Sequence, residues 1–265
     1  MLSVVVAGLQ WALDRMVSVG YGVVYDFVFE RFPPYRDLQR EVLALLETSV
    51  PEGVGRRDVR VLDIGCGPGN FAFSVAEAGF TVVGIDAYDG LLELAREKRR
   101  AKRLPNLAFR HADIARETFR DEGFDQIVNI HSLYVRADPQ RVLTEAHRVL
   151  KPGGHAVFVN FTRRIWLWSS FREVQQREGL GAAFRCLLWV LPNSVFEVTR
   201  RRLGPHYWQE EEFAARLRAA GFTVLAMRRT FFYDASLLAW VRKDTKDEIG
   251  GGAIDRTPGM GPPHD

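Results

Sequence analysis

Several features that would assign the protein to a special class are missing from the sequence. The longest apolar stretch, residues 2–13, ends at Asp14 and falls short of the roughly 18–20 residues of a membrane span. It also lacks the cationic start and the small-residue cleavage site of a signal peptide. Cysteine is scarce, because Cys66 and Cys186 are the only two in 265 residues, which excludes a disulfide scaffold. These absences predict a cytoplasmic protein.

A large excess of charge is missing as well, but the charge is unevenly distributed. The net charge is +3, which is too weak to indicate a nucleic-acid partner. Residues 161–208, however, combine eight arginines with three glutamates and no lysine, which gives this segment a net charge of +5. The segment also holds four of the six tryptophans. Tryptophan beside arginine is typical of a membrane–water interface or an anionic headgroup, and a helical cap with a basic, solvated surface is the alternative.

What is present is the composition of an ordinary globular protein. Hydrophobic residues make up 47% and charged residues 26%, which is enough apolar material for a sizeable core. Residues 1–49 have a helical pattern that breaks near Phe32-Pro33-Pro34. Residues 55–243 form the main domain, with residues 161–208 as an insertion. Residues 244–265 are rich in glycine and proline and predict a disordered tail.

Strand and helix patterns alternate within the main domain. Strands are expected at residues 59–64, 81–85, 107–109, 124–130 and 155–161, and helices at residues 71–78, 91–101 and 140–150. Lys151-Pro152-Gly153-Gly154 ends the last of these helices and turns the chain. Residues 209–243 add a further helix followed by strands. This alternation predicts βαβ units in a parallel sheet, which binds its ligand at the carboxyl ends of the strands.

The most informative segment is the loop after the first strand. Gly65, Gly67 and Gly69 separate that strand from a helix, and without Cβ atoms they let the chain turn tightly and let a ligand approach the backbone. Their spacing differs from the Gly-x-Gly-x-x-Gly of a dinucleotide site. Asp86 ends the next strand, 19 residues after Gly67, where a carboxylate can accept hydrogen bonds from two ribose hydroxyls. Asp113 follows the third strand and can accept a hydrogen bond from an adenine amino group.

This ordered set of residues resembles the class I S-adenosylmethionine-dependent methyltransferases. The matching parts within residues 55–243 are the glycine loop, Asp86, Ala112-Asp113, the strand at 124–130 and Arg148-Val149-Leu150-Lys151-Pro152-Gly153-Gly154. The resemblance implies an α/β fold with a seven-stranded Rossmann-like sheet, mostly parallel, whose last strand near residues 232–242 is antiparallel. It also implies N-terminal helices, a helical cap, S-adenosylmethionine as the cofactor and S-adenosylhomocysteine as its product.

The resemblance further implies which residues hold the cofactor. These are Asp63, Gly65, Cys66, Gly67, Asp86, Ala87, Ala112, Asp113, Ile114 and Asn129. Asp63 and the glycines match residues at the methionyl end, Asp86 matches the ribose ligand, and Asp113 and Ile114 match the residues that flank the adenine. Cys66 is interpreted as a small packing residue rather than a nucleophile. His131, near the sulfonium end, is a candidate general base, a cofactor contact or a loop histidine, and no histidine set has metal-ligand spacing.

The N-terminal segment bears on the acceptor. Residues 2–28 have helical periodicity and one broad apolar face, which can lie on a membrane or cover the cofactor pocket. The polar face is short of lysine and arginine, which weakens the membrane interpretation. Tyr21 and Tyr25 are candidate catalytic-site residues or core residues, because the family often places an N-terminal aromatic side chain over the cofactor. Phe32-Pro33-Pro34-Tyr35 is interpreted as a helix stop, since the Pro-Pro-Tyr element of enzymes that methylate nucleic-acid amino groups follows a strand.

Three functions fit these observations. The leading hypothesis is methyl transfer to an amphipathic, lipid-like acceptor, best a phospholipid headgroup amine, at the inner face of an anionic membrane contacted through residues 1–28 and 161–208. This arrangement is loosely similar to bacterial phospholipid N-methyltransferases. The second is a soluble small-molecule methyltransferase with a closed helical cap, and the third is a non-catalytic cofactor-binding domain. The lack of a catalytic triad does not argue against an enzyme, because methyl transfer mainly requires in-line positioning and the exclusion of water.

Overall fold

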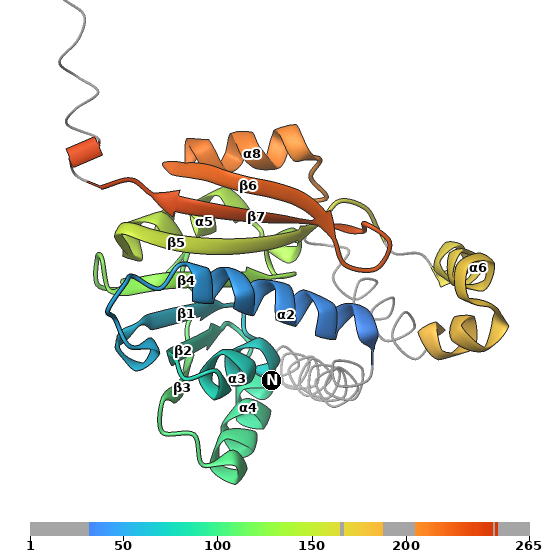
Figure 1. Ribbon diagram of the computed structural model, residues 1–265, viewed down its shortest axis with the longest axis horizontal. Helices are drawn as coiled ribbons and strands as arrows, with labels where there is room; N and C mark the ends of the chain where they lie inside the picture. Colours follow the sequence, from blue (N-terminus) through green and yellow to red (C-terminus); the bar gives the residue numbers. More distant parts are fainter. Residues whose placement is uncertain (1–31, 165–166, 188–204, 246, 249–265) are drawn as a thin grey trace, which may run out of the picture.

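A seven-stranded sheet forms the centre of the molecule. The computed structural model describes residues 32–164, 167–187, 205–245 and 247–248. The strands are β1 (Arg60–Ile64), β2 (Thr81–Asp86), β3 (Leu107–His111), β4 (Phe124–Ile130), β5 (Leu150–Phe161), β6 (Phe222–Thr230) and β7 (Ser236–Lys243). They lie in the order β3-β2-β1-β4-β5-β7-β6, with β1 to β5 parallel and β7 antiparallel to both of its neighbours (Figure 1). The predicted sheet with its antiparallel last strand is therefore confirmed.

Helices cover both faces of this sheet. They are α2 (Pro33–Thr48), α3 (Asn70–Glu77), α4 (Asp89–Lys102), α5 (Pro139–Val149) and α8 (Glu210–Ala219), with short 3-10 helices η1 (Arg56–Asp58) and η2 (Leu133–Val135), whereas α6 (Leu167–Glu178) projects from the main body. One core cluster joins α2 and α3 to the sheet, and a second joins α5 and α8 to it. Central strands are buried on both faces as a result, which explains why their apolar runs are continuous rather than alternating.

The segment Phe32-Pro33-Pro34-Tyr35 begins a helix. Phe32 is the N-cap residue of α2 and Pro33 is its first residue. Proline is favoured at that position because its missing N–H has no intrahelical partner there and its fixed φ suits the helix. The helix after the expected break near residues 32–34 is therefore present, while the helix that this segment was expected to stop lies outside the described residues. Tyr35, one turn into α2, is buried in the core.

Two strands begin four or five residues away from the sequence-based expectation, and the other boundaries differ by two residues or fewer. β5 begins at Leu150 rather than at residue 155, because Leu150 pairs with Phe124 before residues 151–154 bulge out and His155 pairs with Gln126. Gly154 permits this bulge, since a Cβ atom there would lie 2.8 Å from the carbonyl oxygen of Asp125. β7 begins at Ser236 rather than near residue 232, because residues 231–234 form a turn with positive φ.

Part of the predicted cap is described. It consists of α6 and of residues 180–187, which are also helical. Residues 1–31, 188–204 and 249–265, which include the predicted N-terminal helix, the rest of the cap and most of the tail, lie outside the described residues. The described beginning of the tail contacts the sheet, because Glu248 forms an ion pair with Arg242 of β7 at 2.7 Å. Over the ranges described, no helix combines the length and the apolar character of a membrane span.

Candidate active site

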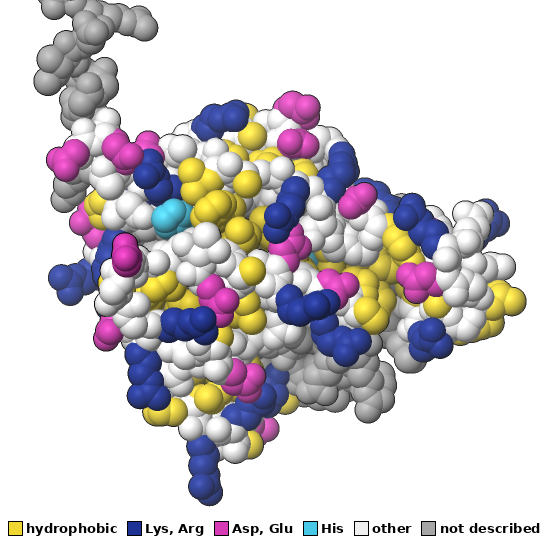
Figure 2. Space-filling view, viewed as in Figure 1, with side chains coloured by type: hydrophobic (Ala, Val, Ile, Leu, Met, Phe, Trp, Pro, Cys, Tyr) yellow, Lys and Arg dark blue, Asp and Glu magenta, His cyan; other side chains and the backbone are white. Residues whose placement is uncertain are grey.

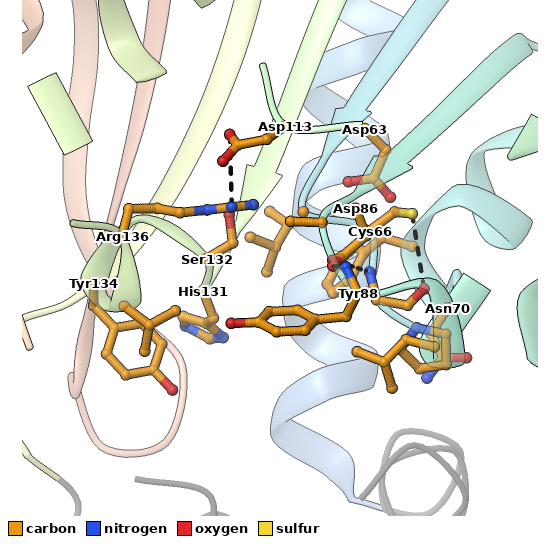
Figure 3. Close-up of a pocket in the computed structure, with 18 of the residues that line it drawn as sticks. Asp63, Cys66, Asn70, Asp86, Tyr88, Asp113, His131, Ser132, Tyr134 and Arg136 are labelled. Atoms are coloured by element: carbon orange, nitrogen blue, oxygen red, sulfur yellow. Dashed lines mark hydrogen bonds and ion pairs between the residues drawn. The ribbon is translucent and has the colours of Figure 1, made fainter. Parts of the chain in front are cut away.

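A cavity of about 330 Å³ opens at the carboxyl ends of the parallel strands. Its walls come from the loop after β1, the ends of β2 and β4, the segment after β3, η2 and the first turn of α2 (Figure 3). One end is polar and is formed by the glycine loop and three aspartates. The other end is mainly aromatic. A cavity of this size and mixed lining is typical of a small-molecule site.

The glycine loop is fastened to the neighbouring strand. The amides of Gly65 and Cys66 both donate to the carbonyl oxygen of Ile85, at 2.8 and 3.0 Å. Gly67 has a φ of 54°, and the nearest neighbour of a Cβ atom there would be the Leu91 side chain at 4.0 Å. At Gly69, by contrast, a Cβ atom would lie 2.6 Å from the ring of Phe109. The loop therefore offers free space to a ligand at Gly67 and is closely packed at Gly69.

Asp63 supplies a buried carboxyl group beneath the loop. Only 3% of the residue is exposed, and its Oδ2 has no hydrogen-bond partner among the described residues. Burial, together with the charge of Asp86, raises the pKa of Asp63 to about 7, and a hydrogen bond from the backbone of Ala72 opposes this rise. A cationic ligand group would satisfy the orphaned oxygen and favour the ionised form.

Asp86 organises the loop while facing the cavity. Its Oδ2 accepts a hydrogen bond from the amide of Gly67, and its Oδ1 accepts one from the amide of Tyr88, both at 2.9 Å. These bonds fix the carboxylate at the end of β2. Because a carboxylate has about four acceptor positions, the remaining lone pairs can receive ligand hydroxyls.

Asp113 belongs to the same polar end and follows β3. Its Oδ1 accepts from the amide of Ala115 at 3.1 Å and lies 3.9 Å from the guanidinium of Arg136, while its Oδ2 lies 3.7 Å from Arg116 (Figure 3). Arg136 is the more buried of the two arginines and also approaches Gly65, where a Cβ atom would lie 3.5 Å from its Nη2. Arg136 thus connects the segment after β3 with the glycine loop.

The aromatic end of the cavity is built around His131. Its ring stacks on Phe161, with centroids 4.0 Å apart and an angle of 6° between the planes. Tyr134 meets the Phe161 ring edge-on at 5.0 Å, and Tyr35 meets the His131 ring edge-on at 6.2 Å. The Nε2 atom of His131 lies 2.8 Å from Ser236 Oγ, and its buried Nδ1 has no partner in the described part of the chain. Burial lowers the pKa of His131 to about 3, so the imidazole is neutral at physiological pH.

A left-handed turn supports this aromatic end from behind. Phe231, Phe232, Tyr233 and Asp234 all have positive φ, between 37° and 62°, and the turn is closed by a hydrogen bond from the amide of Ala235 to the carbonyl oxygen of Phe231. The Phe231 ring lies 4.7 Å from His131 and 4.6 Å from Tyr35. Four consecutive residues other than glycine in this conformation are strained, and such strain clusters at functional sites.

The structure brings most of the sequence-predicted residues together. Seven predicted cofactor residues line the cavity: Asp63, Gly65, Cys66, Gly67, Asp86, Ala87 and Asp113. His131 also lines it, whereas Tyr21 and Tyr25 lie outside the described residues. The Cys66 thiol is buried, and burial, followed by the charges of Asp63 and Asp86, raises its pKa well above the usual range, so the thiolate is disfavoured.

Three predicted cofactor residues lie beneath the cavity rather than in its wall: Ala112, Ile114 and Asn129. Ala112 and Ile114 belong to the core on the α5 side of the sheet. Asn129 is fully buried and donates from Nδ2 to the carbonyl oxygen of Ile64 and to Ser132 Oγ, at 2.9 and 2.7 Å. Its Nδ2 therefore holds the end of β1 in place, while its buried Oδ1 has no partner among the described residues.

Sequence reasoning missed several residues of the wall. These are Tyr35, Pro68, Asn70, Phe71, Tyr88, Leu91, Arg116, Ser132, Tyr134, Val135, Arg136, Ala137 and Phe161. Ile130, which the family resemblance places with His131 at the sulfonium end, also lines the cavity. The position of Tyr88 offered a signal, because it follows Asp86 directly after a strand end. Tyr35 carried none, since only the packing of α2 across the sheet brings it to the cavity.

A parallel sheet with this glycine loop, and with acids at the ends of its first two strands and after the third, defines a class I S-adenosylmethionine-dependent methyltransferase. The residues fit that cofactor: the orphaned Asp63 oxygen suits an ammonium group, Asp86 suits a ribose diol, and the space at Gly67 admits a ligand. A model of the methyltransferase domain family matches residues 56–209, and the chain belongs to that family. S-adenosylmethionine is therefore its cofactor.

Curated relatives include enzymes of quinone biosynthesis. A demethylmenaquinone methyltransferase of Deinococcus radiodurans is 32% identical over 148 residues, which is 53% of this chain and 61% of that protein. A ubiquinone biosynthesis O-methyltransferase of Dinoroseobacter shibae is 39% identical over 37% of this chain and 39% of its own length. A ubiquinone/menaquinone biosynthesis C-methyltransferase of Geobacter sulfurreducens is 29% identical, with coverage of 67% and 70%. The chain thus spans less than two thirds of the length of the first two relatives.

Solved structures share the fold at low sequence identity. A phosphoethanolamine N-methyltransferase of Haemonchus contortus, in complex with phosphomonomethylethanolamine and S-adenosylhomocysteine, has a TM-score of 0.59 and 16% identity, and the match covers 84% of this chain and 57% of that one. An S-adenosylmethionine-dependent methyltransferase of Aquifex aeolicus has a TM-score of 0.55 and 16% identity, with coverage of 84% and 98%. At these identities the likeness concerns the fold alone.

Proposed function

We propose that the protein transfers a methyl group from S-adenosylmethionine to a lipophilic acceptor that carries an aromatic or quinol ring. The observation that carries the proposal is the aromatic end of the cavity, where His131, Phe161, Tyr134 and Tyr35 present ring faces and edges beside the polar cofactor end. Such walls bind a planar apolar ring by offset-stacked and edge-to-face contacts. The quinone methyltransferases among the relatives support this acceptor class.

The residues of the polar end bind and orient the cofactor, which supplies an electrophilic methyl group when bound. Asp63 holds the ammonium group, Asp86 holds the ribose hydroxyls, and Asp113 holds the adenine amino group. The aromatic end would hold the acceptor ring beside the bound cofactor and would exclude water from the reacting groups. Positioning of this kind is the main contribution of the protein, because the sulfonium already activates the methyl group.

His131 acts in this scheme as a stacked ring rather than as a general base. Burial lowers its pKa to about 3, far below the operating pH at which a general base is most effective. Its Nε2 is already bonded to Ser236 Oγ, and its Nδ1 is buried. The proton that the methyl group replaces, a hydroxyl proton in O-methylation or the ring C–H proton in C-methylation, therefore passes to solvent rather than to His131.

A phospholipid headgroup amine at the inner face of an anionic membrane is the second candidate acceptor. Aromatic rings also bind cations, so the same wall can hold an ammonium headgroup. Within the described lining, however, the three carboxylates lie at the cofactor end, and the aromatic end offers none to an amine. A small polar acceptor beneath a closed cap is less well matched, because most of the aromatic end is apolar.

An acceptor panel tests the proposal. Formation of S-adenosylhomocysteine should be measured with a reduced prenylated 1,4-naphthoquinone, with phosphatidylethanolamine and with a small polar catechol. Turnover with the quinol in marked excess over the other two is the expected result. Turnover with phosphatidylethanolamine alone would establish the amine as acceptor and refute the quinol. A matched control is the Phe161→Ala variant, which should lower acceptor affinity while leaving cofactor affinity unchanged.

A further inference from the structure

The outer face of the cap is an exposed aromatic surface. It is formed by Trp168, Leu180 and Phe184, with the half-buried Phe171 beneath the two rings. Trp168 is 74% exposed, Phe184 62% and Leu180 57%, which is unusual for side chains of this size. The rings of Trp168 and Phe184 both lie edge-on to Phe171, at 6.5 and 5.4 Å, so the rings form one continuous cluster.

The inner face of the same cap is well packed. Val174, Ala183 and Cys186 are buried in the core cluster that also contains Phe161, a residue of the aromatic end of the cavity. The exposure of the outer face is therefore not the result of a detached cap. Figure 1 shows α6 projecting from the main body, beyond the right-hand ends of β5 and β7.

Basic side chains border this outer face. Arg172 lies one turn after Trp168, and Arg185 follows Phe184; both are exposed, and neither forms an ion pair with an acid in the part of the chain that the structure describes. The nearby acids are already engaged, since Glu173 pairs with Arg163 and Arg177, and Glu178 accepts a hydrogen bond from Tyr233. Figure 2 shows hydrophobic and basic side chains together on this projecting part of the molecule.

We infer that the outer face of the cap binds the surface of an anionic lipid leaflet. An exposed tryptophan with neighbouring apolar groups suits the boundary between headgroups and acyl chains, and arginines at its border suit anionic phosphates. Such binding is reversible, because α6 is too short to span a bilayer. The inference rests on the proposed function in one respect: a lipophilic acceptor partitions into that leaflet, and the cap shares a core cluster with Phe161 of the cavity lining.

Vesicle flotation tests this surface without cofactor or acceptor, so it is independent of the proposed reaction. Wild type should float with phosphatidylcholine vesicles that contain phosphatidylglycerol, less with pure phosphatidylcholine, and less in high salt because the attraction is screened. The Trp168→Ser/Phe184→Ser variant and the Arg172→Glu/Arg185→Glu variant should each weaken partitioning by roughly tenfold or more, since each arginine near such a surface contributes about fivefold. Thermal unfolding should show both variants folded.

Matched controls lie elsewhere on the molecule. Val54→Ser/Leu225→Ser removes two apolar side chains that are each 41% exposed, and Arg100→Glu/Arg218→Glu reverses two exposed arginines on α4 and α8. Both control variants should float like wild type. Failure of wild type to float at low salt, or equal loss in control and cap variants, would overturn the inference. A dimer that only the cap variants dissociate, seen by sedimentation without any lipid binding, would replace the leaflet with a second copy of the chain.

Discussion

Asp63 and Asp86 lie at the carboxyl ends of the neighbouring parallel strands β1 and β2, and their carboxylates repel each other within one cavity. Burial comes first and the charge of Asp86 second among the causes that raise the pKa of Asp63 to about 7. The free site is therefore close to half-protonated at neutral pH. A bound ammonium group would compensate for both effects, because it stabilises the ionised carboxylate.

Cofactor affinity should consequently fall at acid pH. As the pH drops through about 7, Asp63 in the free protein becomes neutral, and binding of a cationic group then requires release of its proton, so Kd rises by up to about tenfold per pH unit. Calorimetry of S-adenosylhomocysteine binding across this range measures the effect. Asp63→Asn should bind more weakly at neutral pH and lose the dependence. A wild-type Kd that is constant between about pH 5.5 and 7.5 would show that Asp63 does not hold the cation.

Asp63 should also make the stability of the ligand-free protein depend on pH, in the direction opposite to that of cofactor affinity. The folded-state pKa of Asp63 is raised from 3.8 to about 7, so its contribution is complete below pH 3.8 and is lost as the pH rises through about 7, by roughly 4 kcal/mol at most. Asp63→Asn should therefore raise the Tm of the ligand-free protein at pH 8 while weakening cofactor binding. A lower Tm in that variant would contradict this sign.

Asp86 should contribute to both ligand binding and loop order. Asp86→Ala removes the acceptor for the amides of Gly67 and Tyr88 and should weaken cofactor binding by about 1.5–3 kcal/mol with the fold intact. Calorimetry and circular dichroism measure the two effects. Asp89→Ala is the control, since Asp89 forms an exposed ion pair with Arg96 outside the lining. Unchanged affinity in Asp86→Ala would remove Asp86 from the site.

Asp113 should distinguish adenine from other bases. Asp113→Asn keeps an oxygen acceptor and should cost less affinity than Asp113→Ala, which leaves both the amide of Ala115 and the Arg136 guanidinium without this partner. Inosine-type analogues, which lack the amino group, should bind wild type and Asp113→Ala about equally. If both variants bind the normal cofactor like wild type, the adenine pocket lies elsewhere.

Alanine substitutions at Gly67 and Gly69 should have different effects, the first mainly on cofactor affinity and the second mainly on stability. Gly67→Ala places its methyl group in open space and should lower stability by only the roughly 1–2 kcal/mol of a left-handed residue, while it weakens cofactor binding strongly. Gly69→Ala has the same backbone strain and also drives a methyl group into Phe109, so it should lose more stability. Equal Tm losses, with cofactor affinity retained in Gly67→Ala, would contradict the assignment of that space to the ligand.

Replacement of His131 by phenylalanine tests its role. A stacked ring is kept in His131→Phe, so most of the turnover and the pH profile should persist, with a modest loss of stability because Ser236 Oγ loses its partner in the core. The measurement is kcat against pH. A fall in kcat of about a hundredfold or more would instead identify His131 as a general base.

The sequence was sufficient for the sheet and for the polar end of the site, for a physical reason. Buried parallel strands require continuous apolar runs, and a loop that approaches a ligand with its backbone requires glycine, so both leave local signals such as residues 59–64 and Gly65 to Gly69. Asp86 was recognisable because a strand end fixes its position. These features depend on neighbours in the chain.

The aromatic end was not recognisable because its parts are distant in the sequence. Tyr35 reaches the cavity through the packing of α2, and Phe231 reaches His131 through the turn before β7. The family resemblance implied Asn129 as a cofactor residue, and the structure shows that its Nδ2 donates to the Ile64 carbonyl below the cavity lining. The face toward which a strand residue points changes with a shift of one residue in register, and local sequence patterns do not fix the register.

The left-handed turn at residues 231–234 also bears on how this protein can diverge. Glycine is the residue that fits positive φ without strain, yet the first three positions of this turn carry aromatic rings. Two of these rings, Phe231 and Phe232, belong to the core cluster that also contains Phe161. Two kinds of substitution at Phe231 are unfavourable. Glycine would remove the ring, and a β-branched residue would add backbone strain. Exchange of one ring for another avoids both effects. Descendants that accept new substrates should therefore differ here in ring type and seldom in aromatic character.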